Sequence, residues 1–227
     1  MTMEGKATPV KPRRRYDSSR RRRQALRTRD GILDAARRLF LSGGYAGTTI
    51  ASIAEAADVS VETIYKGFGG KPGLVRAISE KGLEGVGPIP AEQRSDEMRT
   101  LERDPRRVMR QWGTFTTEVA PLAAPIALLL RTAAATDPEV AELLDEVNRS
   151  RLARMELNAR ELFERGDFRQ GVTLEHARDV LWTYSSPELY ELLVLHRRWP
   201  RELYGQFVAD GMIAALLPPG TEGTEPG

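Results

Sequence analysis

Apolar residues recur every three to four positions along most of the chain, a spacing that predicts amphipathic helices rather than strands. The first such stripe predicts a helix over residues 28–42, with Thr28 as N-cap and Gly43-Gly44 ending it. Its apolar positions are Ile32, Leu33, Ala36, Leu39 and Phe40. No long alternating pattern typical of a strand follows. The pattern therefore predicts an all-α fold.

Residues 48–71 predict two short helices joined by a tight turn. Thr48 and Thr49 can cap the first helix, whose apolar positions Ile50, Ile53, Ala54 and Ala57 share one face. Asp58 tolerates the left-handed backbone of a turn, Val59 fills the space between the helices, and Ser60 caps a second helix over residues 61–66. This spacing is typical of a helix-turn-helix, which presents its second helix to the DNA major groove.

Further helices are predicted up to residue 217. One begins near Lys71, with Pro72 in its first turn, and ends before Gly85, where we place a domain boundary. After a polar stretch at 86–104, the periodicity predicts helices at about 105–119, 121–135, 138–165, 173–185, 187–197 and 200–217.

Charge divides the chain of 227 residues unevenly, because residues 1–29 hold eleven Lys or Arg and only two acidic residues. That segment carries a net charge of +9, so the rest carries −7 of the total of +2. A basic end indicates a polyanion partner, and a solvated tail is the alternative. We predict a disordered basic arm (1–26), a DNA-binding domain (27–85), a regulatory and dimerisation domain (86–217) and a disordered tail (218–227). The arm either contacts phosphates or the minor groove, or only keeps the chain in solution.

The residues do not indicate an enzyme. There is no Cys, and the sequence holds no Gly-rich phosphate loop with Lys, no HExxH and no GxSxG. The two histidines, His176 and His196, lie on amphipathic stretches among charged neighbours. We therefore expect no catalytic residue, metal or cofactor. The polar N-terminus and the short apolar run at 121–130 predict a cytoplasmic protein with no membrane partner.

The helix-turn-helix stretch resembles the TetR family of bacterial transcriptional regulators. The residues that carry the resemblance are Thr49, Ile53, Ala54, Ala57, Val59, Ser60, Thr63, Ile64, Tyr65, Phe68, Lys71 and Leu74. The chain departs from the family at Asp58, where Gly is usual, at Gly67, where His or Tyr is frequent, and at Gly69-Gly70, which replace a polar cap. A looser resemblance to the family's regulatory domains runs from Gly166 to Tyr204.

This resemblance implies a three-helix DNA-binding head, a larger helical body for ligand binding and dimerisation, and a repressor released from its operator by a small hydrophobic ligand. An architectural or constitutive DNA-binding protein is the alternative. Candidate base contacts are Val61, Glu62, Thr63 and Lys66, although Glu62 can equally point away from the phosphates. Candidate phosphate contacts are Thr49, Tyr65 and Lys71, and the caps Thr48 and Ser60 are further candidate DNA contacts.

A palindromic operator requires two heads, so we expect a homodimer. The stretches at 173–185 and 200–217 hold more apolar residues than one core needs, so we predict the dimer surface there. The alternative is that these residues all belong to the core of one chain. These candidates are Leu174, Val180, Leu181, Tyr184, Leu203, Phe207, Ile213 and Leu216.

An effector pocket is predicted in the body, because Met109, Trp112, Phe115 and Thr116 share one helix face. Leu128, Leu152, Met155 and Trp182 are expected opposite them. Aromatic and Met side chains suit an unidentified hydrophobic ligand, and plain core packing is the alternative. The helix from residue 71 is expected to carry the signal to the head, with Gly82, Gly85 and Gly87 as a flexible joint.

Overall fold

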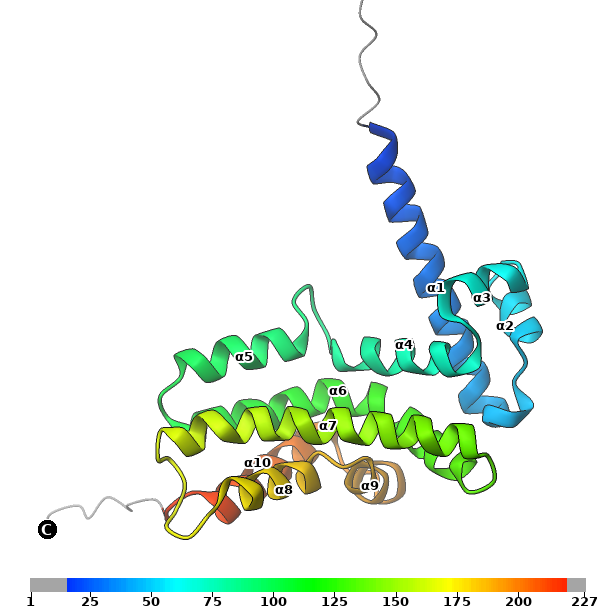
Figure 1. Ribbon diagram of the computed structural model, residues 1–227. Coiled ribbons are helices and arrows are strands. Elements are labelled where there is room, and N and C mark those ends of the chain that lie inside the picture. Colours follow the sequence, from blue (N-terminus) through cyan, green and yellow to red (C-terminus); the bar gives the residue numbers. More distant parts are fainter. Residues whose placement is uncertain (1–15, 220–227) are drawn as a thin grey trace, which may run out of the picture.

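The computed structural model describes residues 16–219, which form helices joined by short connections and contain no strand within that range (Figure 1). The prediction of an all-α fold is confirmed. Four helices form the head: α1 (Tyr16–Gly47), α2 (Ile50–Ala56), α3 (Val61–Phe68) and α4 (Lys71–Leu83). The body consists of α5 (Ala91–Leu101), α6 (Pro105–Ala134), α7 (Pro138–Glu164), α8 (Leu174–Tyr184), α9 (Pro187–Tyr190), a π-helical turn (Glu191–His196) and α10 (Arg201–Leu216).

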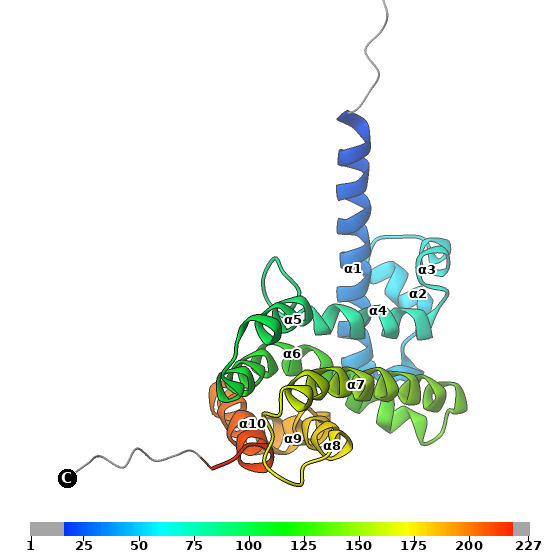
Figure 2. The same cartoon turned by 60° about the vertical axis from the view of Figure 1, so that its left-hand side comes forward.

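Helix α1 begins twelve residues earlier than its apolar stripe predicts. It is helical from Tyr16, with a break in helical geometry at Gly44 (φ 74°, ψ 167°). Its N-terminal half projects beyond the rest of the head, on the side away from the body (Figures 1 and 2). The prediction of a disordered arm is therefore wrong for residues 16–26. Their low apolar content prevents burial, but these residues can still extend a helix whose later turns are packed in the head. The rest of that prediction, and residues 220–227 of the tail, lie outside the described residues.

Helix α6 is continuous where the sequence predicted two helices separated at residue 120. Pro121 and Pro125 both lie inside it. Each proline removes one backbone donor, and neighbouring helices compensate, since α6 contacts α1, α4, α5, α7, α9 and α10. The predicted short apolar run is thus part of a helix that is long and apolar enough to cross a membrane by length and composition alone. In the described chain its buried residues pack against the neighbouring helices.

Two hydrophobic clusters hold the chain together, and they do not divide at residue 85. The first joins α1–α4 of the head to the ends of α6 and α7, through Ile126, Leu130, Val140 and Leu143. The second fills the body between α6, α7, α8 and α10. The head is packed directly on α6 and α7, so the packing does not mark a separate domain that ends near Gly85. The domain boundary there stays a prediction.

Candidate functional site

The helix-turn-helix is fixed by local capping interactions. Thr49 accepts from the backbone N–H of Ser52, and the Ser52 hydroxyl accepts from the Thr49 N–H, which is a complete capping box. Asp58 has φ 52°, so it makes the turn as predicted. Ser60 then caps α3 by accepting from the Thr63 N–H at 3.2 Å. Each cap satisfies one of the free N–H groups at its helix start, which helps to stabilise the short helices α2 and α3.

Helix α3 buries one side chain and exposes a polar face. Ile64 is fully buried against the other head helices. The candidate base contacts Val61, Glu62, Thr63 and Lys66 are exposed, and so is the candidate phosphate contact Tyr65. The structure therefore brings five of the predicted DNA contacts to one accessible helix. The hydroxyls of Ser60 and Thr63 lie 2.9 Å apart and bond to each other.

Thr48 does not belong with these residues. Its side chain is 4 % exposed, and its hydroxyl lies 3.0 Å from the carbonyl of Leu39 and 2.8 Å from that of Gly44. The hydroxyl ties the end of α1 to the start of α2, where the helical geometry of α1 breaks at Gly44. The prediction of a DNA contact through this side chain is wrong, because burial keeps it from a phosphate.

The Lys71 ammonium is partly engaged within the head. Its Nζ donates to the carbonyl of Tyr45 at 2.7 Å and lies 4.3 Å from the centroid of the Tyr45 ring. Burial is the main cause that raises the pKa of Tyr45, so the ring stays a neutral phenol at physiological pH. An ammonium has three N–H donors, so Lys71 keeps donors for a phosphate while it also fixes the start of α4.

Arg29 is a residue of this region that the sequence reasoning missed. Its guanidinium lies 4.6 Å from the centroid of the Phe68 ring, and it lines a cavity of about 460 Å³ together with Tyr65, Lys66 and Gly67. The cavity sits beside the exposed end of α3. A run of arginines was the available signal, but the spacing alone did not say which one would reach α3.

The predicted effector residues divide into two groups. Met109, Trp112 and Phe115 are buried in the body cluster, against which Met155 packs, and Trp112 Nε1 donates to Ser95 Oγ at 3.1 Å. The other four candidates, Thr116, Leu128, Leu152 and Trp182, are half-buried. Neither of the two cavities described for residues 16–219 is lined by any of the eight. In this conformation the first group serves as core, the alternative that the sequence left open.

Trp182 is covered by a cation. The Arg151 guanidinium lies 4.3 Å from the centroid of the indole ring and donates to the Trp182 carbonyl at 2.7 Å and to Ser185 Oγ at 3.1 Å. Burial lowers the pKa of Arg151 to about 10. The Trp182 indole N–H is buried without a partner among the described residues. This half of the predicted pocket therefore holds a donor with no acceptor.

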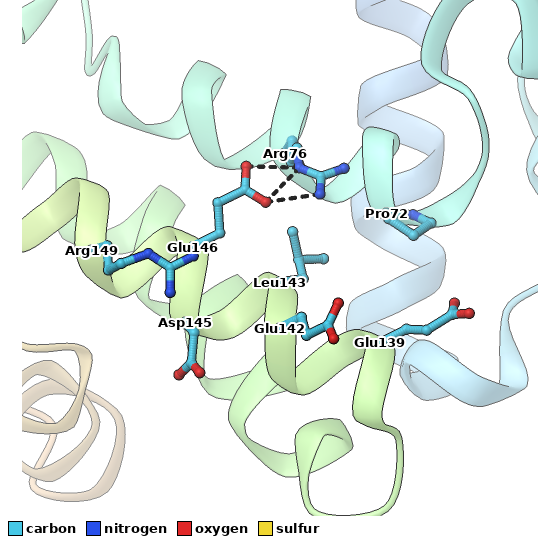
Figure 3. Close-up of a pocket in the computed structure, with 8 residues that line it drawn as sticks. All are labelled: Pro72, Arg76, Glu139, Glu142, Leu143, Asp145, Glu146 and Arg149. Carbon is cyan, nitrogen blue, oxygen red and sulfur yellow. Dashed lines mark hydrogen bonds and ion pairs between the residues drawn. The ribbon is translucent and has the colours of Figure 1, made fainter.

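A second cavity, of about 400 Å³, opens between α4 and α7 (Figure 3). Arg76 from α4 faces Glu146 from α7, with Nη2–Oε2 at 2.8 Å. The hydrogen bond from Arg76 lowers the pKa of Glu146. The remaining lining is Pro72, Glu139, Glu142, Leu143, Asp145 and Arg149. This polar lining does not suit a hydrophobic ligand, and the ion pair instead joins the head to the body.

The predicted dimer surface is partly core. Leu181 and Leu216 are buried within the chain, so both are wrong as interface residues. Leu203 and Phe207 on α10 are 44 % and 38 % exposed, although the Phe207 ring also meets Tyr184 and Trp199 edge-on. Leu174, Val180, Tyr184 and Ile213 are half-buried. An apolar part of α10 thus remains uncovered.

Comparison with known proteins now bears on this arrangement. Residues 32–78 match the family described as bacterial regulatory proteins, tetR family. Over these residues the chain is similar to the TetR family. It is 39% identical over 74 residues to the HTH-type transcriptional regulator YvkB of Bacillus subtilis (strain 168), covering 33% of this chain and 39% of that protein. It is 38% identical over 56 residues to the HTH-type transcriptional repressor ComR of Escherichia coli (strain K12), covering 25% and 27%.

Among solved structures, the SmeT–triclosan complex aligns with a TM-score of 0.66 and 25% identity, over 88% of this chain and 97% of that one. The chain spans well under half the length of YvkB and ComR, whereas the structural alignment covers head and body. The family and the architecture predicted from the sequence are confirmed. YvkB and ComR are both HTH-type transcriptional regulators, and the family match covers the helix-turn-helix of this chain.

Proposed function

We propose that the protein is a cytoplasmic repressor that binds a palindromic operator as a homodimer and leaves it when a small hydrophobic ligand enters the body. The observation that carries the proposal is the exposed polar face of α3, which is held by caps at Thr49 and Ser60 in a head that matches the TetR family. A short helix cannot hold this orientation alone, so the rest of the head must position it.

The DNA contacts divide by chemistry. Glu62 accepts from a cytosine amino group, and Val61 and Thr63 touch a thymine methyl, while Lys66 reaches base edges or phosphates from the last turn of α3. Tyr65, Thr49, Ser60 and Lys71 contact phosphates and set the register. Tyr65 is 54% exposed, which supports this assignment.

Two heads are needed because one α3 reads only a few base pairs. The second copy covers the exposed side chains Leu203 and Phe207 of α10, together with the half-buried apolar residues of α8. Charged residues are sparse along this part of α10, as the core of a stable interface requires. A two-fold axis through this surface places the heads on half-sites about one helical turn or more apart.

The effector enters the body between α6, α7 and α8. The triclosan complex of SmeT supports a ligand site in a body of this architecture. Ligand binding separates Met109, Trp112 and Phe115 from Met155, which packs against the same cluster, and the unpartnered Trp182 N–H offers one hydrogen bond. If the ligand-bound body holds the two heads at another separation, the heads no longer fit both half-sites and the operator is released. Ligand binding and operator binding then weaken each other by the same factor.

Selection of operators from random duplexes by the purified full chain tests the proposal. We expect a palindrome that is bound at least about 10³-fold more tightly than bulk DNA at the same salt concentration. Glu62→Gln should change the preferred base at one position of each half-site, while the control Glu164→Gln, at the exposed end of α7, should not. Triclosan is the first probe for release. Equal affinity for operator and bulk DNA would instead identify an architectural protein.

A further inference from the structure

The first turns of α1 are exposed to solvent in the part of the chain that the structure describes. The buried residues of α1 begin at Ile32, whereas every residue from Arg20 to Arg27 is exposed, including Leu26 at 54%. Residues 20–31 extend for about 18 Å at the rise of an α-helix. They project beyond the head, on the side away from the body (Figures 1 and 2). Burial in this chain does not explain why the segment is helical and so strongly charged.

The charge of this segment is the opposite of that of the helix-turn-helix. Residues 20–29 contain six arginines and no acidic residue. Residues 48–71 contain three acidic residues, Glu55, Asp58 and Glu62, and two lysines, for a net charge of −1. Neutralised phosphates supply most of the sequence-independent affinity for DNA. The helix-turn-helix therefore lacks the positive charge that sequence-independent DNA affinity requires. The neighbouring helix α1 carries that charge.

The arginines are also placed beside the recognition helix. Arg29 lies over the Phe68 ring at the end of α3, and Arg22, seven residues earlier, shares that face of α1. It lies about 10 Å further from the head along the helix axis. Arg20, Arg23 and Arg27, at i, i+3 and i+7, occupy the other side. The projecting helix thus presents positive charge around its circumference, starting from a point that touches α3.

We propose that residues 20–29 of α1 form a second DNA-binding element, which contacts backbone phosphates beside the half-site that α3 reads. This inference rests on the proposed function. Base readout and phosphate affinity are then divided between two helices that meet at Arg29 and Phe68. A basic helix in water is disfavoured by its own repulsion, and phosphates relieve that repulsion on binding.

The test measures operator affinity against salt concentration for the full chain. Arg20, Arg22, Arg23 and Arg27 are changed together to Gln, which keeps helix propensity and removes four charges. The slope of log K against log salt should become shallower by up to about 3.6, at about 0.9 per phosphate contact. Raising salt fourfold should then weaken the wild type about 150-fold more than the variant. The preferred operator sequence should not change.

Two further variants separate charge from structure. Gln at Arg103, Arg110, Arg169 and Arg201 removes the same charge from exposed positions of the body, and should leave the slope unchanged. Lys at the four α1 positions should retain the wild-type slope, because phosphate neutralisation needs charge rather than a guanidinium. Far-UV circular dichroism and the unfolding midpoint show whether each variant is folded.

The outcomes distinguish this inference from the proposed function. If the wild type binds no operator specifically, the proposed function fails first. If it does, and the α1 variant keeps the slope or loses no more than the body control, the second element is refuted. The last measurement is binding of the wild type to vesicles of phosphatidylglycerol and phosphatidylcholine. Wild-type binding to them that excludes the operator would assign the helix to a membrane surface and overturn the proposal.

Discussion

A proline in the body creates a hydrogen-bond acceptor for the head. Pro125 has no N–H, so the carbonyl of Pro121, four residues earlier in α6, lacks its normal helical donor. Arg37 of α1 takes that place, with Nη2 donating to the Pro121 carbonyl at 3.1 Å. The Arg37 Nε is buried and has no partner among the described residues. We predict that replacing Arg37 with Met weakens the fold, and that Pro125 determines by how much.

The magnitude follows from these two features. A hydrogen bond from a charged donor contributes about 1.5–3 kcal/mol, and a buried donor left without a partner costs about 1–3 kcal/mol. Arg37→Met removes the hydrogen bond to the Pro121 carbonyl, but it also removes the buried Nε that has no partner. We therefore expect the free energy of unfolding to fall by about 1 kcal/mol. For a chain of this size that loss lowers the unfolding temperature by about 2–4 °C. In Pro125→Ala, a new N–H reaches the Pro121 carbonyl, and the same change should cost almost nothing.

A double-mutant cycle in urea, at one fixed protein concentration because of dimer linkage, measures this coupling. Pro121→Ala is the matched control, because its new N–H reaches the carbonyl of Thr117 and leaves the acceptor of Arg37 unchanged. We expect a coupling free energy of about 1 kcal/mol between positions 37 and 125 and none between 37 and 121. An equal cost of Arg37→Met in all three backgrounds would refute this reasoning.

Three shorter predictions follow. Gly113→Ala should destabilise the body by about 1–3 kcal/mol in urea unfolding, because its Cβ would lie within 2.3 Å of the Gly205 carbonyl oxygen, whereas Gly67→Ala meets open space and should be neutral or stabilising. Gly67→His, in the same exposed turn of α3, should strengthen operator binding without changing base preference, by adding a phosphate donor. The hydrogen bond from Arg94 lowers the pKa of Glu118 below its usual 4.5, so stability is lost as pH falls through the lowered value. Glu118→Gln should therefore reduce the pH dependence of the urea midpoint below pH 4.5.

The helix-turn-helix was predictable because its signals are local. The caps at Thr49 and Ser60 and the left-handed Asp58 each act within three or four residues, so the sequence contains the whole interaction. The start of α10 at residue 201 was anticipated within one residue for the same reason, since Pro200 immediately precedes it. The site residues on α3 follow directly once the helix phase is known.

The continuity of α6 and the role of the aromatic face were not predictable in this way. A proline inside a helix usually ends it, and the carbonyl that Pro125 leaves free is satisfied by Arg37, a partner distant in sequence. Met109, Trp112 and Phe115 fit a pocket or a core equally well by spacing, and the choice depends on what α8 and α10 place opposite them. Burial of the Thr48 hydroxyl likewise depends on carbonyls at the end of α1.

Signal transfer between body and head need not pass through α4 alone, although α4 is the chain link between them. Gly82 is packed inside α4, where an added Cβ would lie 3.4 Å from the Ala123 N atom of α6, so it is a contact point and not part of a flexible joint. Arg37 joins α1 to α6 between the two prolines, and Arg76 joins α4 to α7 through Glu146. Two head helices thus rest on the same segment of α6. We therefore expect a displacement of that segment to move α1 and α4 together and to preserve the geometry of α3 within the head.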